Sequence, residues 1–143
     1  MLKGLNPLLS PDLLYVLAGM GHGDEVALVD RNFPAVSTGR RLVALTGLDV
    51  TTAASAILSV LPLDTFVERP VARMEVVGDA DTVPEVQQEV FALCRTAEGR
   101  DVKIASLTRE AFYERARLAF AVVATTEARP YGCFLLTKGV IND

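Results

Sequence analysis

The chain has 143 residues, of which 50% are apolar and 22% are charged, so we expect one ordered domain with a packed core. The net charge of −4 and the pI near 5.0 argue against a nucleic-acid-binding protein, which normally carries a basic face. No apolar run approaches the ~20 residues that a membrane span needs, and the first residues do not resemble a secretory signal. Two cysteines make no disulfide framework, so we expect a reduced, cytoplasmic domain with no membrane contact.

The mean hydropathy of +0.32 is high for a small domain. A chain of this length buries only about two-thirds of the surface that it exposes when unfolded. The surplus of apolar side chains therefore predicts contacts between subunits, and we expect a homo-oligomer.

Helices and strands are expected to alternate along the chain. A helix should begin after the cap Ser10 and end near Gly21, a second should follow Asp49 and carry Leu61 on its apolar face, and a third should open with a capping box at 82–85 and end before Gly99. A fourth should follow Thr108. The predicted strands are 26–29, 42–45, 72–77, 102–105, 118–124 and 134–136. This alternation predicts an α/β fold over residues 1–143, a layered sandwich around a central, mostly parallel or mixed sheet.

His22 is the only histidine of the chain and lies between glycines, where the first helix stops and the first strand begins. Histidine is the one side chain whose ordinary pKa allows it to gain or lose a proton near neutral pH. The alternative is a structural ring that satisfies carbonyl groups at the helix C-terminus. The two flanking glycines leave the ring approachable and favour a catalytic role.

Asp30 and Arg109 are candidate binding residues. Asp30 follows a predicted buried strand, and ligands of open α/β sheets gather beyond the carboxyl ends of strands. Its alternative is a turn aspartate that accepts hydrogen bonds from the backbone of Asn32 or Phe33. Arg109 follows the cap Thr108 at the positive end of a helix, where a cation is unfavourable, so an anionic or hydroxyl-rich partner is a candidate to hold it. Its alternative is an exposed arginine.

Tyr113 and Tyr131 can hydrogen-bond and stack on a polar ligand, although half-buried tyrosines more often serve packing. Cys133 precedes an apolar strand and is expected to behave as a small buried hydrophobe rather than a nucleophile. The chain has no dinucleotide fingerprint, no phosphate loop and no nucleophile elbow. With a single histidine it offers no zinc site either, so we expect no metal and no cofactor.

The motifs together resemble one known family, the L-fucose mutarotases and D-ribose pyranases. The resemblance rests on the segments 19–25, 30–35, 112–116, 131–132 and 138–140, and it runs nearly from end to end. It implies an α/β sandwich, a ring-shaped homo-oligomer that is often a decamer, and cofactor-free interconversion of sugar anomers.

The resemblance also implies roles for particular residues. His22 takes the position of the catalytic proton donor, and Asp30, Arg109 and the segment Tyr131, Gly132, Cys133 take sugar-binding positions. Arg109 and Tyr113 indicate the fucose branch, because the ribose branch has histidine and lysine there. Cys133 is a departure, since the family usually has asparagine, and a thiol is a weaker donor and acceptor than an amide.

Anomer exchange requires one acid, one base and a pocket that holds the sugar hydroxyls. His22 can supply the acid and, on ring closure, the base. Asp30, Tyr113 and water are candidates for the second proton acceptor. Because His22 and Asp30 flank one strand, they can share a ligand only if the glycine loop folds back over the sheet or if a neighbouring subunit supplies one of them. We favour an active site between subunits.

Three rival hypotheses remain. A pyranase would shift D-ribose between six- and five-membered rings, and Arg109 argues against it. A monosaccharide-binding protein without catalysis would keep Asp30 and Arg109 but would not need His22. A purely structural ring protein would bind no sugar.

Overall fold

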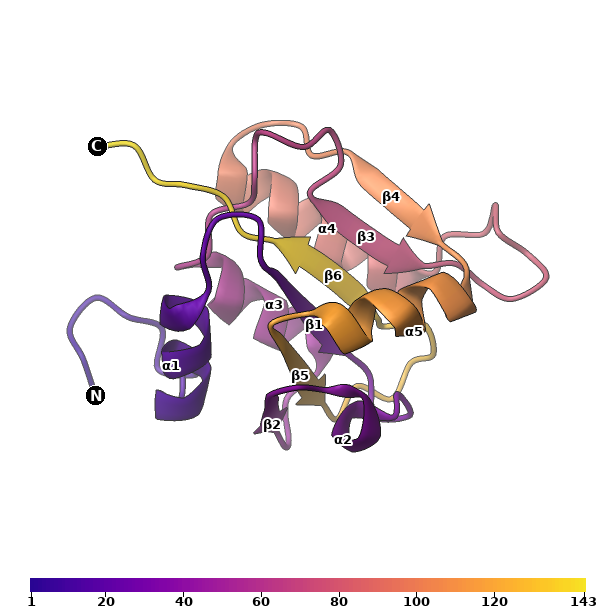
Figure 1. Ribbon diagram of the computed structural model, residues 1–143, viewed down its shortest axis with the longest axis horizontal. Coiled ribbons are helices and arrows are strands. Elements are labelled where there is room, and N and C mark those ends of the chain that lie inside the picture. The colour runs from indigo at the N-terminus through magenta and orange to yellow at the C-terminus, as the bar shows by residue number, and fades with distance from the viewer.

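The computed structural model describes residues 1–143 and is built around a six-stranded sheet (Figure 1). In spatial order the strands are β2 (Leu42–Leu45), β5 (Ala121–Thr125), β1 (Glu25–Val29), β6 (Phe134–Thr137), β3 (Val71–Met74) and β4 (Ile104–Leu107). β6 is antiparallel to both of its neighbours, and the other three pairs are parallel. Five strands therefore end at one edge of the sheet, where β6 begins, and the predicted mixed sheet is confirmed.

Helices cover both faces of this sheet (Figure 1). On one face α1 (Pro11–Gly19), α3 (Val50–Leu58) and α4 (Glu85–Glu98) contribute to a cluster of 27 buried residues. On the other face α2 (Ala35–Thr38) and α5 (Arg109–Leu118) contribute to a cluster of 12. Side chains of β6 alternate between the two, since Phe134 and Leu136 enter the larger cluster and Leu135 the smaller. The predicted sandwich is confirmed.

Three predicted helix caps are present. Ser10 Oγ accepts a hydrogen bond from Leu13 N–H at 3.2 Å, Asp49 Oδ1 from Thr52 N–H at 2.7 Å, and Thr108 Oγ1 from Ala111 N–H at 3.2 Å. Each satisfies one backbone N–H that the first turn of a helix leaves without a partner. Gly99 ends α4 in the left-handed conformation, with a φ of 66°.

The predicted capping box at 82–85 is wrong. α4 begins after Pro84, which makes no side-chain cap. Thr82 instead donates its hydroxyl to Asp79 Oδ2 at 2.5 Å and closes a turn. Its carbonyl accepts a hydrogen bond from the buried Arg73 at 3.0 Å, which holds this segment outside the helix.

Other boundaries differ because tertiary partners set them. β3 ends at Met74, since β6 pairs with it only as far as Arg73, and the predicted continuation through 77 is a turn. β4 lies two residues later than predicted, with Ile104 opposite Val71. Leu118 belongs to the last turn of α5, so the strand predicted from 118 begins at Ala121. Leu61 is buried but lies beyond the end of α3, and the short α2 was not predicted.

None of the helices combines the length and the apolar character that a membrane span requires.

Candidate functional site

A cleft of about 410 Å³ opens at the edge of the sheet where the five strands end. Its volume lies in the range of about 300–1,000 Å³ that is typical of small-molecule sites. Five of the seven candidate residues line it: Asp30, Arg109, Tyr113, Tyr131 and Cys133. They come from the ends of β1, α5 and the segment before β6, so the topology gathers residues that are about 100 positions apart.

Asp30 is a turn aspartate, as its alternative predicted, and it also lines the cleft. Its side chain is buried, and Oδ1 accepts hydrogen bonds from the N–H groups of Asn32 at 3.0 Å and Phe33 at 3.1 Å. These hydrogen bonds fix the Asp30 carboxylate just beyond the C-terminal end of β1. The Cys133 thiol donates a weak hydrogen bond to Oδ2 at 3.5 Å, which leaves this oxygen with acceptor capacity on the side of the cleft.

Cys133 is a buried thiol in the wall of the cleft. Burial raises its pKa well above the ordinary value, and the negative charge of Asp30 raises it further. The side chain is therefore a neutral thiol at physiological pH, and a thiol is a poor nucleophile. This agrees with the interpretation of Cys133 as a packing residue.

Arg109 and Tyr113 lie one turn apart on α5. Nε of Arg109 donates to the Tyr113 hydroxyl at 3.4 Å, and the guanidinium lies 5.2 Å from the centre of the tyrosine ring. The hydrogen bond raises the pKa of Arg109, so the group stays charged. Phe33 packs edge-on against Tyr113, with 5.0 Å between the ring centres, and holds the tyrosine ring in place.

Tyr131 forms part of the opposite wall of the cleft, and Gly132 lies behind it. Tyr131 has a φ of 63°, and its carbonyl accepts a hydrogen bond from the buried Gln87 at 3.0 Å. Its hydroxyl accepts one from Val77 N–H at 3.2 Å. Gly132 itself does not line the cleft: a Cβ there would lie 3.1 Å from Cγ of Glu127 and 3.5 Å from Cβ of Asp30. Glycine allows this segment to pack directly behind the carboxylate.

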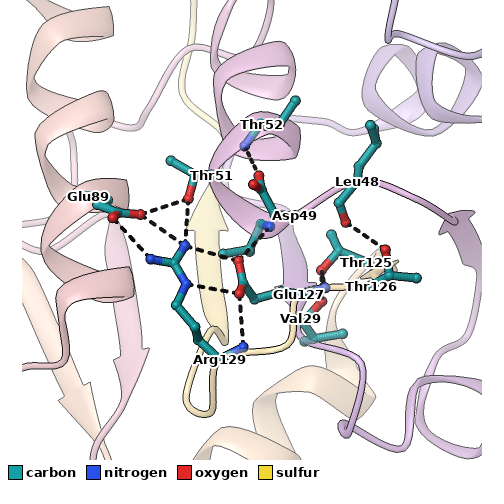
Figure 2. Close-up of polar contacts among 11 residues, drawn as sticks. Val29, Leu48, Asp49, Thr51, Thr52, Glu89, Thr125, Thr126, Glu127 and Arg129 are labelled. Atoms are coloured by element: carbon teal, nitrogen blue, oxygen red, sulfur yellow. Dashed lines mark hydrogen bonds and ion pairs between the residues drawn. The ribbon is translucent and has the colours of Figure 1, made fainter.

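A polar cluster that the sequence reasoning missed holds the segment 126–132 (Figure 2). Glu127 accepts from the backbone and Nε of Arg129 at 2.9 and 3.0 Å through Oε1, and from Val50 N–H at 3.2 Å through Oε2. Arg129 also donates to Glu89 at 3.0 Å and to Thr51 at 3.2 Å. Glu127 follows the end of β5 much as Asp30 follows the end of β1. This similar position could have indicated Glu127 as a site residue from the sequence.

His22 lies at the other edge of the sheet, outside the cleft. The glycine loop does not fold back, because Gly23 N–H donates to the carbonyl of Lys138 at 2.8 Å and Lys138 N–H donates to that of Asp24 at 2.9 Å. The side chain is 42% exposed, so the ring is open to solvent. Nε2 lies 2.9 Å from Oδ1 of Asp64, and the ring packs on Phe66 with 4.8 Å between ring centres.

His22 does not make the contact with the carbonyls at the end of α1 that the structural alternative predicted. Those carbonyls accept hydrogen bonds from Lys138 instead. Its Nζ donates to the carbonyl of Leu17 at 3.1 Å and to that of Met20 at 2.5 Å. The partner of His22 is a buried carboxylate. Burial alone would raise the pKa of Asp64, but the hydrogen bonds from Phe66 N–H and from His22 outweigh it and lower that pKa.

Nowhere in residues 1–143 do three or more His, Cys, Asp or Glu side chains gather in a way that could hold a metal ion.

A mixed α/β sandwich with a cleft beyond the carboxyl ends of its strands, lined by apolar side chains and a few polar ones, is typical of proteins that bind small molecules. The chain belongs to the RbsD / FucU transport protein family, whose model matches residues 3–141. It is 41% identical to the L-fucose mutarotase of Histophilus somni over 140 residues, covering 98% of this chain and 97% of the relative. It is 47% identical to the fucose mutarotase of Homo sapiens over 146 residues, covering 98% and 94%.

Among solved structures, the fold matches the fucose mutarotase from Streptococcus pneumoniae in complex with L-fucose. The TM-score is 0.92 at 37% identity, over 99% of this chain and all of the other. The family expected from the sequence motifs is therefore confirmed.

Proposed function

We propose that this protein is an isomerase that interconverts the α and β anomers of L-fucose or a related aldose without a cofactor. The observation that carries the proposal is the cleft in which Asp30, Arg109 and Tyr131 converge, in a chain that matches fucose mutarotases over almost its whole length. A carboxylate and a guanidinium at one cleft suit a sugar, because both form charge-assisted hydrogen bonds with hydroxyl groups.

The proposed reaction opens and recloses the sugar ring. The ring oxygen takes a proton as its bond to the anomeric carbon breaks, and the anomeric hydroxyl loses its proton to a second acceptor. The resulting aldehyde rotates about one carbon–carbon bond and closes on its other face, with both protons returning. His22 acts as the acid and then as the base. Asp30, Arg109 and the segment 131–133 hold the hydroxyls.

The position of His22 requires a second subunit. β1 has five residues, and at about 3.3 Å per residue it separates His22 from Asp30 by roughly 17 Å. We therefore propose a homo-oligomer, a decameric ring as the resemblance implies, in which His22 of one subunit reaches the cleft of the next. An exposed apolar side chain beside His22 supports such a contact, since Phe66 packs on the ring and is 73% exposed.

We further propose that residues 1–143 act as one mutarotase-like domain in the cytoplasm. Cys94 and Cys133 are both buried free thiols, which suits a reducing compartment. Burial raises the pKa of Cys94 to about 12, so this thiol is also inert.

The test is a panel of aldoses followed by saturation-transfer NMR with and without protein. We expect the protein to accelerate exchange between the two pyranose anomers of L-fucose. A pyranase would instead accelerate exchange between ribose pyranose and furanose. Sugar binding without any acceleration would show a binding protein and would contradict the proposal.

A further inference from the structure

Gln87 of α4 is fully buried, and its side-chain amide contacts two residues that line the cleft. Nε2 donates to the carbonyl of Met74 at 2.7 Å and to that of Tyr131 at 3.0 Å. Oε1 accepts from Nη1 of Arg73 at 3.2 Å. Carbonyls only accept hydrogen bonds and a guanidinium only donates them, so these partners determine which end of the amide carries the nitrogen. Gln87 therefore holds its partners in a single arrangement.

The amide joins two backbone segments that both carry cleft side chains. Met74 ends β3, and Tyr131 belongs to the segment that precedes β6. Met74 N–H donates to the carbonyl of Cys133 at 3.2 Å, so the two segments lie side by side. Met74, Tyr131 and Cys133 all line the cleft. The hydrogen bonds from Gln87 therefore fix the relative position of side chains that form one wall of the cleft.

Tyr131 adopts a backbone conformation that needs such support. Its φ of 63° is the one positive φ outside the glycines, and this left-handed region is unfavourable for a tyrosine. A conformation of this kind persists where its surroundings hold it, and it often marks a functional site. Gln87 binds the Tyr131 carbonyl, and the N–H of Val77 binds the Tyr131 hydroxyl at 3.2 Å. Tyr131 is thus held at its backbone and at the far end of its ring.

Arg73 connects Gln87 with the turn that follows β3. Its buried guanidinium donates to the carbonyls of Ala80 and Thr82, the latter at 3.0 Å, in addition to Oε1 of Gln87. All three acceptors are neutral oxygens, so in these contacts Arg73 orients the backbone and the amide rather than neutralising a carboxylate. The segment that it holds, 75–82, includes the N–H group that binds the tyrosine hydroxyl.

We propose that Gln87 is a positioning residue for sugar binding. Its amide, oriented by Arg73, holds Tyr131 in the left-handed conformation that keeps the phenol ring in the wall of the cleft, where the ring contacts the sugar. Gln87 itself does not line the cleft, so it acts through Tyr131. Loss of the amide weakens sugar binding and leaves proton transfer by His22 unchanged, so KM changes and kcat does not. This inference rests on the proposed function.

Gln87→Met tests the proposal, because it removes the amide and keeps the length of the side chain. KM for L-fucose should rise about 2–10-fold, the range expected for one lost hydrogen bond, with little change in kcat. The amide proton of Val77 should also exchange faster with water in 15N NMR spectra, because the Tyr131 hydroxyl that accepts its hydrogen bond is no longer fixed. Gln88→Met is the matched control. Gln88 is the exposed neighbour on the same helix, and both readouts should stay unchanged.

A second background separates positioning of the ring from a general loss of packing. In Tyr131→Ala, the further change Gln87→Met should leave KM unaltered, because no ring remains to be positioned. An equal rise of KM in both backgrounds, or unchanged KM and Val77 exchange in a folded Gln87→Met, would overturn the inference. Gln87→Asn, whose shorter amide does not reach both carbonyls, replaces Gln87→Met if that variant does not fold. Failure of the proposed function would appear separately, as a wild-type protein that accelerates no anomer exchange although its Val77 amide responds to Gln87→Met.

Discussion

Cys133 shows how one side chain can alter a binding site without altering the fold. The thiol fills a buried position in the wall of the cleft and makes only a weak hydrogen bond to Asp30. In the family pattern this position carries asparagine, whose amide can donate and accept strong hydrogen bonds. The cleft of this protein therefore offers a sugar one strong hydrogen-bonding group fewer at position 133.

Cys133→Asn should tighten the binding of L-fucose. One added hydrogen bond contributes about 0.5–1.5 kcal/mol, which corresponds to a roughly 2–10-fold lower Kd. Titration calorimetry measures the change, with the melting temperature as a check on folding. Cys94→Ser is the control, because that buried cysteine lies in the larger core cluster and not at the cleft. Unchanged affinity in a folded Cys133→Asn would mean that the position does not contact the sugar.

The individual site residues differ in how far the sequence could reveal them. Asp30 follows the end of a strand, Arg109 opens a helix and Cys133 precedes a strand, and such positions can be recognised from the local sequence. Asp64 lies 42 residues from His22 and carries no local signal. Gln87 was expected only as part of a helix, yet it is fully buried and binds the Tyr131 carbonyl. Such contacts depend on tertiary packing, which one sequence does not display.

At the scale of elements, the chain reveals where helices begin better than where strands end. Ser10, Asp49 and Thr108 cap their helices through contacts within three residues, so the signal is local. A strand ends where its partner ends, and that partner is distant in sequence. The observed bounds of β3 and β4 therefore differ from the predicted bounds, although both strands are present.

The cluster around Glu127 ties two helices to the segment that forms one wall of the cleft (Figure 2). It joins the start of α3 through Val50, α4 through Glu89, and the segment that carries Tyr131 and Gly132. Burial by itself would raise the pKa of Glu127, but the hydrogen bonds from Arg129 and Val50 outweigh it and lower that pKa below the ordinary 4.5. The ionised carboxylate therefore stabilises the folded state.

Glu127→Gln should lower the free energy of unfolding at pH 7 by about 1–3 kcal/mol, because an amide nitrogen cannot accept and one buried donor loses its partner. A carboxylate whose pKa is lowered by folding contributes stability above its unfolded pKa and loses it as the pH falls through the folded value. The difference between variant and wild type should thus shrink as the pH falls below about 4.5.

Urea denaturation at several pH values measures this difference. Glu68→Gln is the control, since its ion pair with Lys103 is exposed and contributes little. A difference that stays constant down to pH 3 would show that the charge of Glu127 is unimportant.

At the scale of the whole molecule, a single copy of the chain does not bring His22 and the cleft together. They lie at opposite edges of the sheet, and backbone hydrogen bonds hold the glycine loop in place. The proposed active site is therefore complete only in the oligomer.

Mixing two inactive variants tests this arrangement. His22→Ala keeps an intact cleft, and Asp30→Asn keeps an intact histidine. If the variants are unfolded and refolded together at equal amounts, about a quarter of the sites should combine a wild-type histidine with a wild-type cleft, so activity should return to about a quarter of the wild-type value. Refolding each variant alone is the control. Activity that stays absent in demonstrably mixed oligomers would place both residues in one subunit.

The most direct measurement is the rate of L-fucose anomer exchange for the wild type and for His22→Ala, followed by saturation-transfer NMR. The variant loses a hydrogen bond to the buried Asp64 carboxylate, so its melting temperature should fall, but the ring is partly exposed and the variant should stay folded. The exchange rate should fall by about 10²–10⁴-fold, the contribution expected of a positioned acid–base group. Exchange at the wild-type rate in a folded His22→Ala would contradict the account.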